Sequence, residues 1–169
     1  MHEWDIIEMA EELARQFSRD PFQLAEAEEV TVSFCDLKSQ PGAYYVVRGY
    51  PILLLSEHLP PAVTEMVCAH EMGHHLLHRD ILFRRQVEKN PPPLGEETVR
   101  RTEREANLFA ASFLLPDDTV LPPFEESAKA LGLPTEFLKI KAAAMRILGK
   151  LPPTEEPDPC FLRYAAGAR

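Results

Sequence analysis

The period of the hydrophobic pattern changes at the pair Pro60-Pro61, and this change constrains the fold more than any other feature. Before it, residues 30–55 alternate between apolar and polar side chains or form short apolar runs, which is the pattern of β-strands. After it, apolar residues recur about every 3.6 positions, which is the period of an α-helix. We therefore expect an α+β fold in which a small sheet packs on the helices that follow.

Three strands and several helices can be placed from the same patterns. We expect strands at residues 30–37, 43–48 and 52–55, which form an antiparallel or mixed three-stranded sheet. Pro41-Gly42 has the residue order of a type II turn, and so short a connection favours antiparallel pairing of the first two strands. Helices are expected at residues 3–18, 61–78, 96–115, 123–131 and 135–148, with a loop over 80–95.

Composition limits the classes of protein to which the chain can belong. The 169 residues are 45% hydrophobic and 27% charged, a balance typical of a globular domain with a sizeable core. The net charge of -9 argues against direct nucleic-acid binding and against attraction to anionic membranes. We find no signal peptide and no apolar run of the ~20 residues that a membrane span needs, and the scattered cysteines fit a reduced, cytoplasmic compartment.

The segment AHEMGH at residues 69–74 contains the motif HExxH. On a helix His70 and His74 lie one turn apart on the same face, so both imidazoles can reach one zinc ion. Glu71 points about 100° around the axis and can act as a general base on a water molecule beside them. Five residues can form this pattern by chance, and the alternative is a polar, histidine-rich helix face. The apolar residues around the motif favour the metal site, because buried histidines need partners.

A third metal ligand is available on the second long helix. Glu103, Asn107 and Ala110 form one stripe there, with Ala106 beside it. If the two alanines pack closely against the histidine helix, Glu103 faces the histidines and Asn107 can hydrogen-bond the outer atom of a ligand. The alternative is that Glu103 is an exposed helix charge. Glu105 is the reserve ligand, expected on the solvent side of the helix with Arg101 and Arg104.

The other histidines are expected outside the metal site. His78 lies about 12 Å along the axis from His70, so we interpret it as a hydrogen-bonding residue near a helix end. His75 is expected to face solvent. Tyr44, Tyr45 and His78 are candidates for the group that stabilises a developing oxyanion.

The chain contains two separated segments, AHEMGHHLLH and EREANLFAASFLLP, followed by a helical end rich in leucine and alanine. In this combination it resembles the ImmA/IrrE family of bacterial and phage metallopeptidases. The resemblance covers residues 30–148. It implies a zincin-like fold with one Zn²⁺ held by His70, His74 and Glu103, and with Glu71 as the base. Known members of that family cleave helix-turn-helix transcriptional repressors during DNA damage or mobile-element induction, so the resemblance implies a repressor as the protein substrate.

Three regions are expected along the chain: a zincin-like catalytic domain over residues 1–116, a helical extension packed on it over 117–150, and a proline-rich tail over 151–169. Residues 127–134 and the helix after them resemble a helix-turn-helix, but their excess of positive charge is small for DNA binding. The alternative function is a regulatory binding module with a structural zinc site that contacts a repressor or DNA without cleavage. Glu71 favours the peptidase, because a structural site needs no base.

Overall fold

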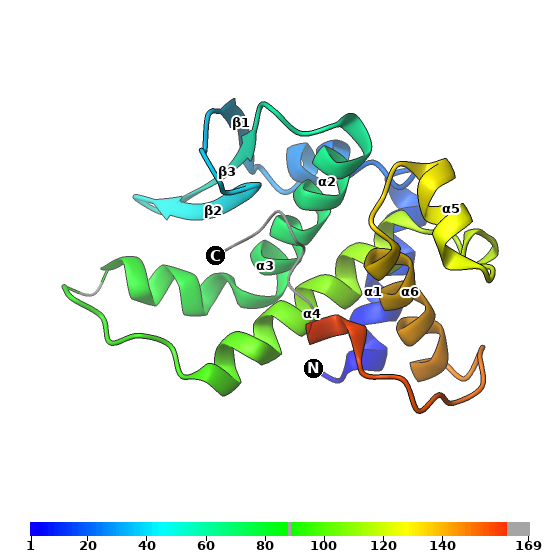
Figure 1. Cartoon of the computed structure of the whole chain (residues 1–169). Helices are drawn as coiled ribbons and strands as arrows, with labels where there is room; N and C mark the ends of the chain where they lie inside the picture. The colour runs from blue at the N-terminus through cyan, green and yellow to red at the C-terminus, as the bar shows by residue number, and fades with distance from the viewer. Residues whose placement is uncertain (88, 162–169) are drawn as a thin grey trace.

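The computed structural model describes residues 1–87 and 89–161 and has the α+β architecture that the sequence predicts (Figure 1). Its elements in chain order are α1 (Glu3–Gln16), α2 (Pro21–Ala27), β1 (Thr31–Cys35), β2 (Gly42–Val47), β3 (Tyr50–Ser56), α3 (Pro61–Val87), α4 (Glu96–Leu114), the 3-10 helix η1 (Asp117–Thr119), α5 (Phe124–Leu131), α6 (Thr135–Ile147) and the 3-10 helix η2 (Pro159–Phe161). In Figure 1 the sheet lies above α3, and α4 crosses beneath.

The three strands form a mixed sheet in the order β1-β3-β2. β1 is parallel to β3, and β2 is antiparallel to β3. The expected antiparallel pairing of the first two strands is therefore wrong. The hairpin turn is at Arg48-Gly49, where both residues have positive φ, as a two-residue hairpin loop requires. The apolar run at 52–55 takes the centre of the sheet, since it buries the most side-chain surface there.

α3 is longer than its expected range. It continues past His78 to Val87, so the first half of the loop expected over 80–95 is helical. No proline or glycine occurs between His78 and Pro91. Ile81 and Leu82 are partly buried, so the packed surface of the helix extends beyond His78. His78 therefore lies inside the helix and faces a neighbour rather than a helix end.

The crossing of α3 and α4 is close because its contact residues are small. A Cβ atom built on Gly73 would lie 3.1 Å from the Cα atom of Ala106, so any larger residue would crowd the backbone of α4 at this crossing. Ala106 and Ala110 are completely buried. The expected packing against the motif helix is confirmed for Ala106, which brings the middle of α3 against the middle of α4.

The remaining helices complete one hydrophobic core. Ile6 of α1, Phe109 of α4, Phe137 of α6 and Cys160 of η2 belong to the same buried cluster. The expected division of the chain at residues 116 and 150 stays a prediction, and residues 162–169 of the expected tail lie outside the described part. None of the helices in the described ranges combines the length and the apolar character needed to cross a bilayer.

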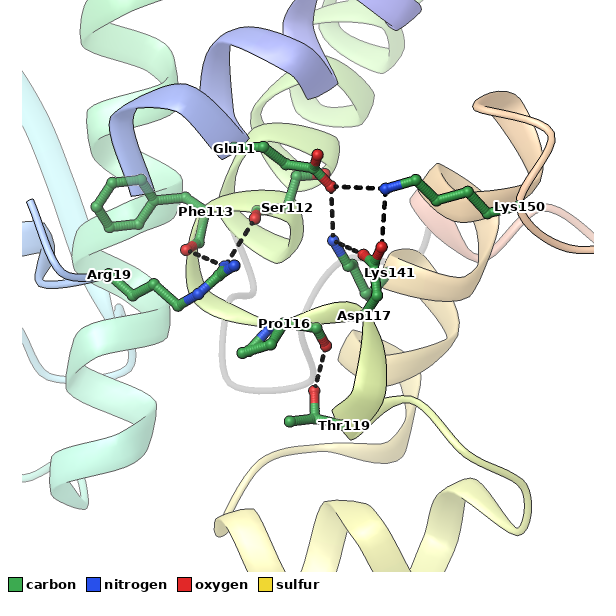
Figure 2. Close-up of polar contacts among 9 residues, drawn as sticks. All are labelled: Glu11, Arg19, Ser112, Phe113, Pro116, Asp117, Thr119, Lys141 and Lys150. Carbon is green, nitrogen blue, oxygen red and sulfur yellow. Dashed lines mark hydrogen bonds and ion pairs between the residues drawn. The ribbon is translucent and has the colours of Figure 1, made fainter. Parts of the chain in front are cut away.

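A cluster of charges around the buried Lys141 joins α1, η1 and α6 (Figure 2). Lys141 is 1% exposed and pairs with Glu11 at 3.2 Å and with Asp117 at 2.9 Å. Lys150 also binds Asp117, at 2.7 Å. A buried ammonium group needs such partners to offset its lost hydration. Both lysines are neutralised within the fold, which weakens the interpretation of this helical end as a DNA-binding surface.

Candidate metal centre

The crossing of α3 and α4 brings together His70, His74 and Glu103. The Nε2 atom of His70 lies 3.3 Å from one carboxylate oxygen of Glu103, and the Nε2 atom of His74 lies 3.2 Å from the other. Both histidines are buried, and the side chain of Glu103 is 22% exposed. Glu103 thus faces the histidines and is not an exposed helix charge.

These three side chains fit a zinc site. Their two imidazole nitrogens and one carboxylate oxygen lie within 4.8 Å of one another. Two nitrogens and one oxygen from three side chains form a ligand set that catalytic zinc sites use, with further positions left for water or substrate. The rings of His70 and His74 are 4.8 Å apart and nearly perpendicular, so their nitrogens converge without stacking. The donor set is therefore compatible with zinc.

The charge of Glu103 also suits a cation site. Burial alone would raise the pKa of Glu103, but the imidazoles of His70 and His74 that face its carboxylate outweigh this effect. The pKa therefore lies well below its ordinary value, and the carboxylate is ionised at neutral pH. The ionised form is the one that binds a metal ion.

Asn107 orients His70 and links it to the C-terminal segment. The Nδ1 atom of His70 donates a hydrogen bond of 2.8 Å to the amide oxygen of Asn107, which can only accept. The amide nitrogen of Asn107 donates to the carbonyl oxygen of Cys160 at 3.1 Å. The hydrogen bond expected for Asn107 is present, and it leaves Nε2 of His70 on the Glu103 side.

His74 has a different partner, which the sequence did not predict. Its Nδ1 atom lies 3.0 Å from Nδ1 of His78, and Nε2 of His78 lies 2.7 Å from a carboxylate oxygen of Glu105. The expectation that Glu105 faces solvent is wrong: its side chain is 19% exposed and turned toward α3. Arg104, expected on the same side of the helix, instead pairs with Glu3 and Asp158.

The environment of His78 explains this arrangement. Because α3 continues to Val87, His78 is buried against α4 and needs a polar partner. Burial lowers the pKa of His78, and the hydrogen bond with Glu105 offsets part of that effect. The i,i+4 spacing of His74 and His78 was the sequence signal for their contact.

His75 is also buried, and the expectation that it faces solvent is wrong. It is 3% exposed, and its Nδ1 atom lies 2.7 Å from the hydroxyl oxygen of Tyr44. Burial lowers the pKa of His75 to about 4, with a further contribution from Arg79, so the ring is neutral at neutral pH. The reason is that β2 covers this side of α3, which the sequence pattern of α3 alone does not reveal.

Glu71 lies beneath β2 at the edge of the histidine cluster. Its side chain is completely buried, and a Cβ atom built on Gly42 would lie 3.5 Å from its Cγ atom. Glu71, His74 and Glu103 line one cavity of about 140 Å³. The candidate base and two of the three candidate metal ligands therefore face the same small space.

The residues considered for oxyanion stabilisation differ in position. Tyr44 and His78 line the cavity. Tyr45 is 45% exposed and, as the next residue along β2, points to the opposite face of the sheet. The apolar part of the cavity wall consists of Ile81, Leu82, Leu94 and Val99.

Comparison with known proteins places this geometry in a family. The model of peptidase M78, described as the IrrE N-terminal-like domain, matches residues 25–146. "Uncharacterized immunity region protein 2" of Bacillus phage phi105 is 29% identical over 132 residues, which cover 72% of this chain and 78% of the relative. The family match contains the whole sheet, α3 and α4, and thus every residue of the histidine and glutamate cluster. The chain accordingly belongs to the peptidase M78 family, with the IrrE N-terminal-like domain as its fold.

Proposed function

We propose that this protein is a zinc-dependent endopeptidase that cleaves a helix-turn-helix transcriptional repressor in the cytoplasm. The observation that carries the proposal is the cavity that Glu71 shares with His74 and Glu103. A structural zinc site needs no general base, so a buried carboxylate in that cavity favours catalysis over a binding module without cleavage. Membership of a peptidase family supports the same reaction class.

In this proposal His70, His74 and Glu103 hold one Zn²⁺. The ion, when bound, lowers the pKa of a water molecule and polarises the scissile carbonyl group. Glu71 accepts the proton of that water molecule and later donates it to the departing amine, so the proton returns to the products. Its burial beneath β2 keeps the carboxylate close to the ligand side chains and limits competing contacts with bulk water.

The substrate class rests on two observations. The phage relative carries the name of an immunity region, and the sequence motifs resemble a family whose members cut repressors. The small cavity favours a narrow substrate range, because a peptide must present an extended segment to reach it. β2 is an edge strand beside this cavity, and its outer edge could pair with such a segment.

Cleavage by purified, zinc-loaded protein tests the proposal. The substrates are any helix-turn-helix repressor encoded beside this gene, a panel of other helix-turn-helix repressors, and casein as a general substrate. We expect cleavage at one position in the neighbouring repressor, loss of cleavage when a chelator is added, and little degradation of casein. Glu71→Gln should bind zinc and lower the cleavage rate by about 10²–10⁴-fold. The matched control is Glu97→Gln, an exposed glutamate of α4 that should cleave normally.

Three results would contradict parts of this account. Normal cleavage by Glu71→Gln would refute the role of the base. Rapid degradation of casein would refute the narrow substrate range. Metal-dependent cleavage of unrelated proteins, without cleavage of any repressor tested, would refute the substrate class.

A further inference from the structure

We infer that His78 and Glu105 are positioning residues that hold His74 in the single tautomer and orientation suited to binding a metal ion. The inference rests on the proposed zinc site. It adds two residues to that site and gives separate roles to the two glutamates of the segment EREAN.

The geometry links three side chains in a row from α3 to α4. Nδ1 of His74 lies 3.0 Å from Nδ1 of His78, and Nε2 of His78 lies 2.7 Å from a carboxylate oxygen of Glu105. Both histidines are buried, so water does not compete freely for these contacts. We call this row of His74, His78 and Glu105 the relay.

The hydrogen positions in the relay follow from the chemistry of its last member. An ionised carboxylate can only accept a hydrogen bond, so Nε2 of His78 carries a proton and donates a hydrogen bond to Glu105. A neutral imidazole has one proton, so Nδ1 of His78 is an acceptor. The proton between the two Nδ1 atoms therefore belongs to His74. With its proton on Nδ1, neutral His74 has a lone pair on Nε2, the atom that faces Glu103.

The relay differs from the arrangement around His70. His70 donates to the neutral amide of Asn107, whereas His74 donates to an imidazole that ends on a carboxylate. A carboxylate at the end of such a row makes the ligating nitrogen more basic and fixes the plane of the ring. Glu103 thus faces Nε2 of His74, the nitrogen that would bind the metal ion. Glu105 accepts the hydrogen bond of His78 and so orients His74 through its Nδ1 atom. Glu105, expected from the sequence as the reserve ligand, is therefore a positioning residue.

Zinc affinity is the first test, measured by competition with a chromogenic chelator. We expect His78→Phe to weaken zinc binding by about 10–100-fold, the range for outer-shell partners of metal ligands. Glu105→Gln should weaken zinc binding less, because the amide oxygen still accepts a hydrogen bond from His78 but carries no charge. His58→Phe and Glu97→Gln change exposed residues of the same types and should bind zinc as the wild type does. Circular dichroism of each variant checks that it is folded.

Nitrogen-15 NMR of the zinc-loaded wild type is the second test, and it needs no variant. The relay requires a proton on Nδ1 of His74 and a proton on Nε2 of His78. A merely structural role for His78 would fix neither position. A proton on Nδ1 of His78, or wild-type zinc affinity in both relay variants, would overturn the relay and leave the zinc site intact. No zinc binding by the wild type would overturn the relay and the proposed function together.

Discussion

Gly73 of α3 lies against the backbone of Ala106 of α4: a Cβ atom at Gly73 would be 3.1 Å from the Cα atom and 3.2 Å from the carbonyl oxygen of Ala106. Those two backbone atoms cannot move aside as the end of a side chain can. His74 is the residue after Gly73, and Glu103 lies three residues before Ala106. The separation of the two helices at this contact therefore fixes the distance between the histidines and the glutamate.

Gly73→Ala should lower both stability and zinc affinity. Alanine favours a helix by about 1 kcal/mol over glycine, but overpacking a close contact costs about 1–3 kcal/mol. We expect the crowding to prevail, with a net loss of up to about 2 kcal/mol in urea denaturation. The control is Gly95→Ala, where an added Cβ atom meets nothing within 4 Å. A Gly73→Ala protein as stable as the wild type, with unchanged zinc affinity, would show that the crossing is looser than described.

Asn107 offers a way to separate the orientation of His70 from the attachment of the C-terminal segment. Asn107→Ala removes the acceptor for His70 and the donor for the Cys160 carbonyl, so zinc affinity should fall by about 10–100-fold. Asn107→Asp keeps an acceptor for His70 but cannot donate to Cys160. It should retain zinc while losing about 1–3 kcal/mol of stability, because a buried carbonyl is left without its donor. Loss of zinc binding by Asn107→Asp equal to that of Asn107→Ala would contradict this separation.

Asp117 should make the stability of the fold depend on pH. Burial alone would raise its pKa, but hydrogen bonds from Lys150 and Lys141 outweigh it and lower the pKa below 3.8. A carboxyl group with a lowered pKa in the folded state stabilises the fold at neutral pH, and this contribution disappears as the pH falls through the folded-state pKa. Asp117→Asn should therefore destabilise the protein at neutral pH, and the difference from the wild type should shrink as the pH falls below 3.8.

Urea denaturation across this pH range measures the effect of Asp117. Asp118→Asn, a change at the exposed neighbouring residue, is the control and should show little difference at any pH. A difference in stability between Asp117→Asn and the wild type that is the same at all pH values would mean that the stabilisation by Asp117 does not come from its charge.

The sequence predicted those parts of the structure that depend on local spacing. The pairing of His70 with His74, the stripe of Glu103 and Asn107, and the close packing at Ala106 all follow from the helical period and from side-chain size. The helix ends at Leu114 and Leu131 were placed within one residue because proline or glycine follows closely. Local signals were also overlooked: Asp20 caps α2 and Pro21 begins it, a common start for a helix.

The parts that were predicted wrongly depend on contacts between distant segments. The parallel pairing of β1 with β3 joins residues separated by the whole of β2, and nothing in either strand specifies it. His75 and Glu105 lie on helix faces that look solvent-exposed when each helix is considered alone. Tyr44 of β2 lies against His75, and His78 of α3 lies against Glu105. Periodicity gives the direction of a side chain, but not the element that packs against it.

Anomalous diffraction at the zinc edge, from crystals of zinc-loaded protein, tests the central claim most directly. The account predicts one strong peak between α3 and α4, about 2.0–2.2 Å from Nε2 of His70, Nε2 of His74 and a carboxylate oxygen of Glu103. Glu105 should remain bound to His78, away from the ion. A peak that contacts Glu105 in place of Glu103, or a zinc ion bound elsewhere while these three side chains point apart, would contradict the account.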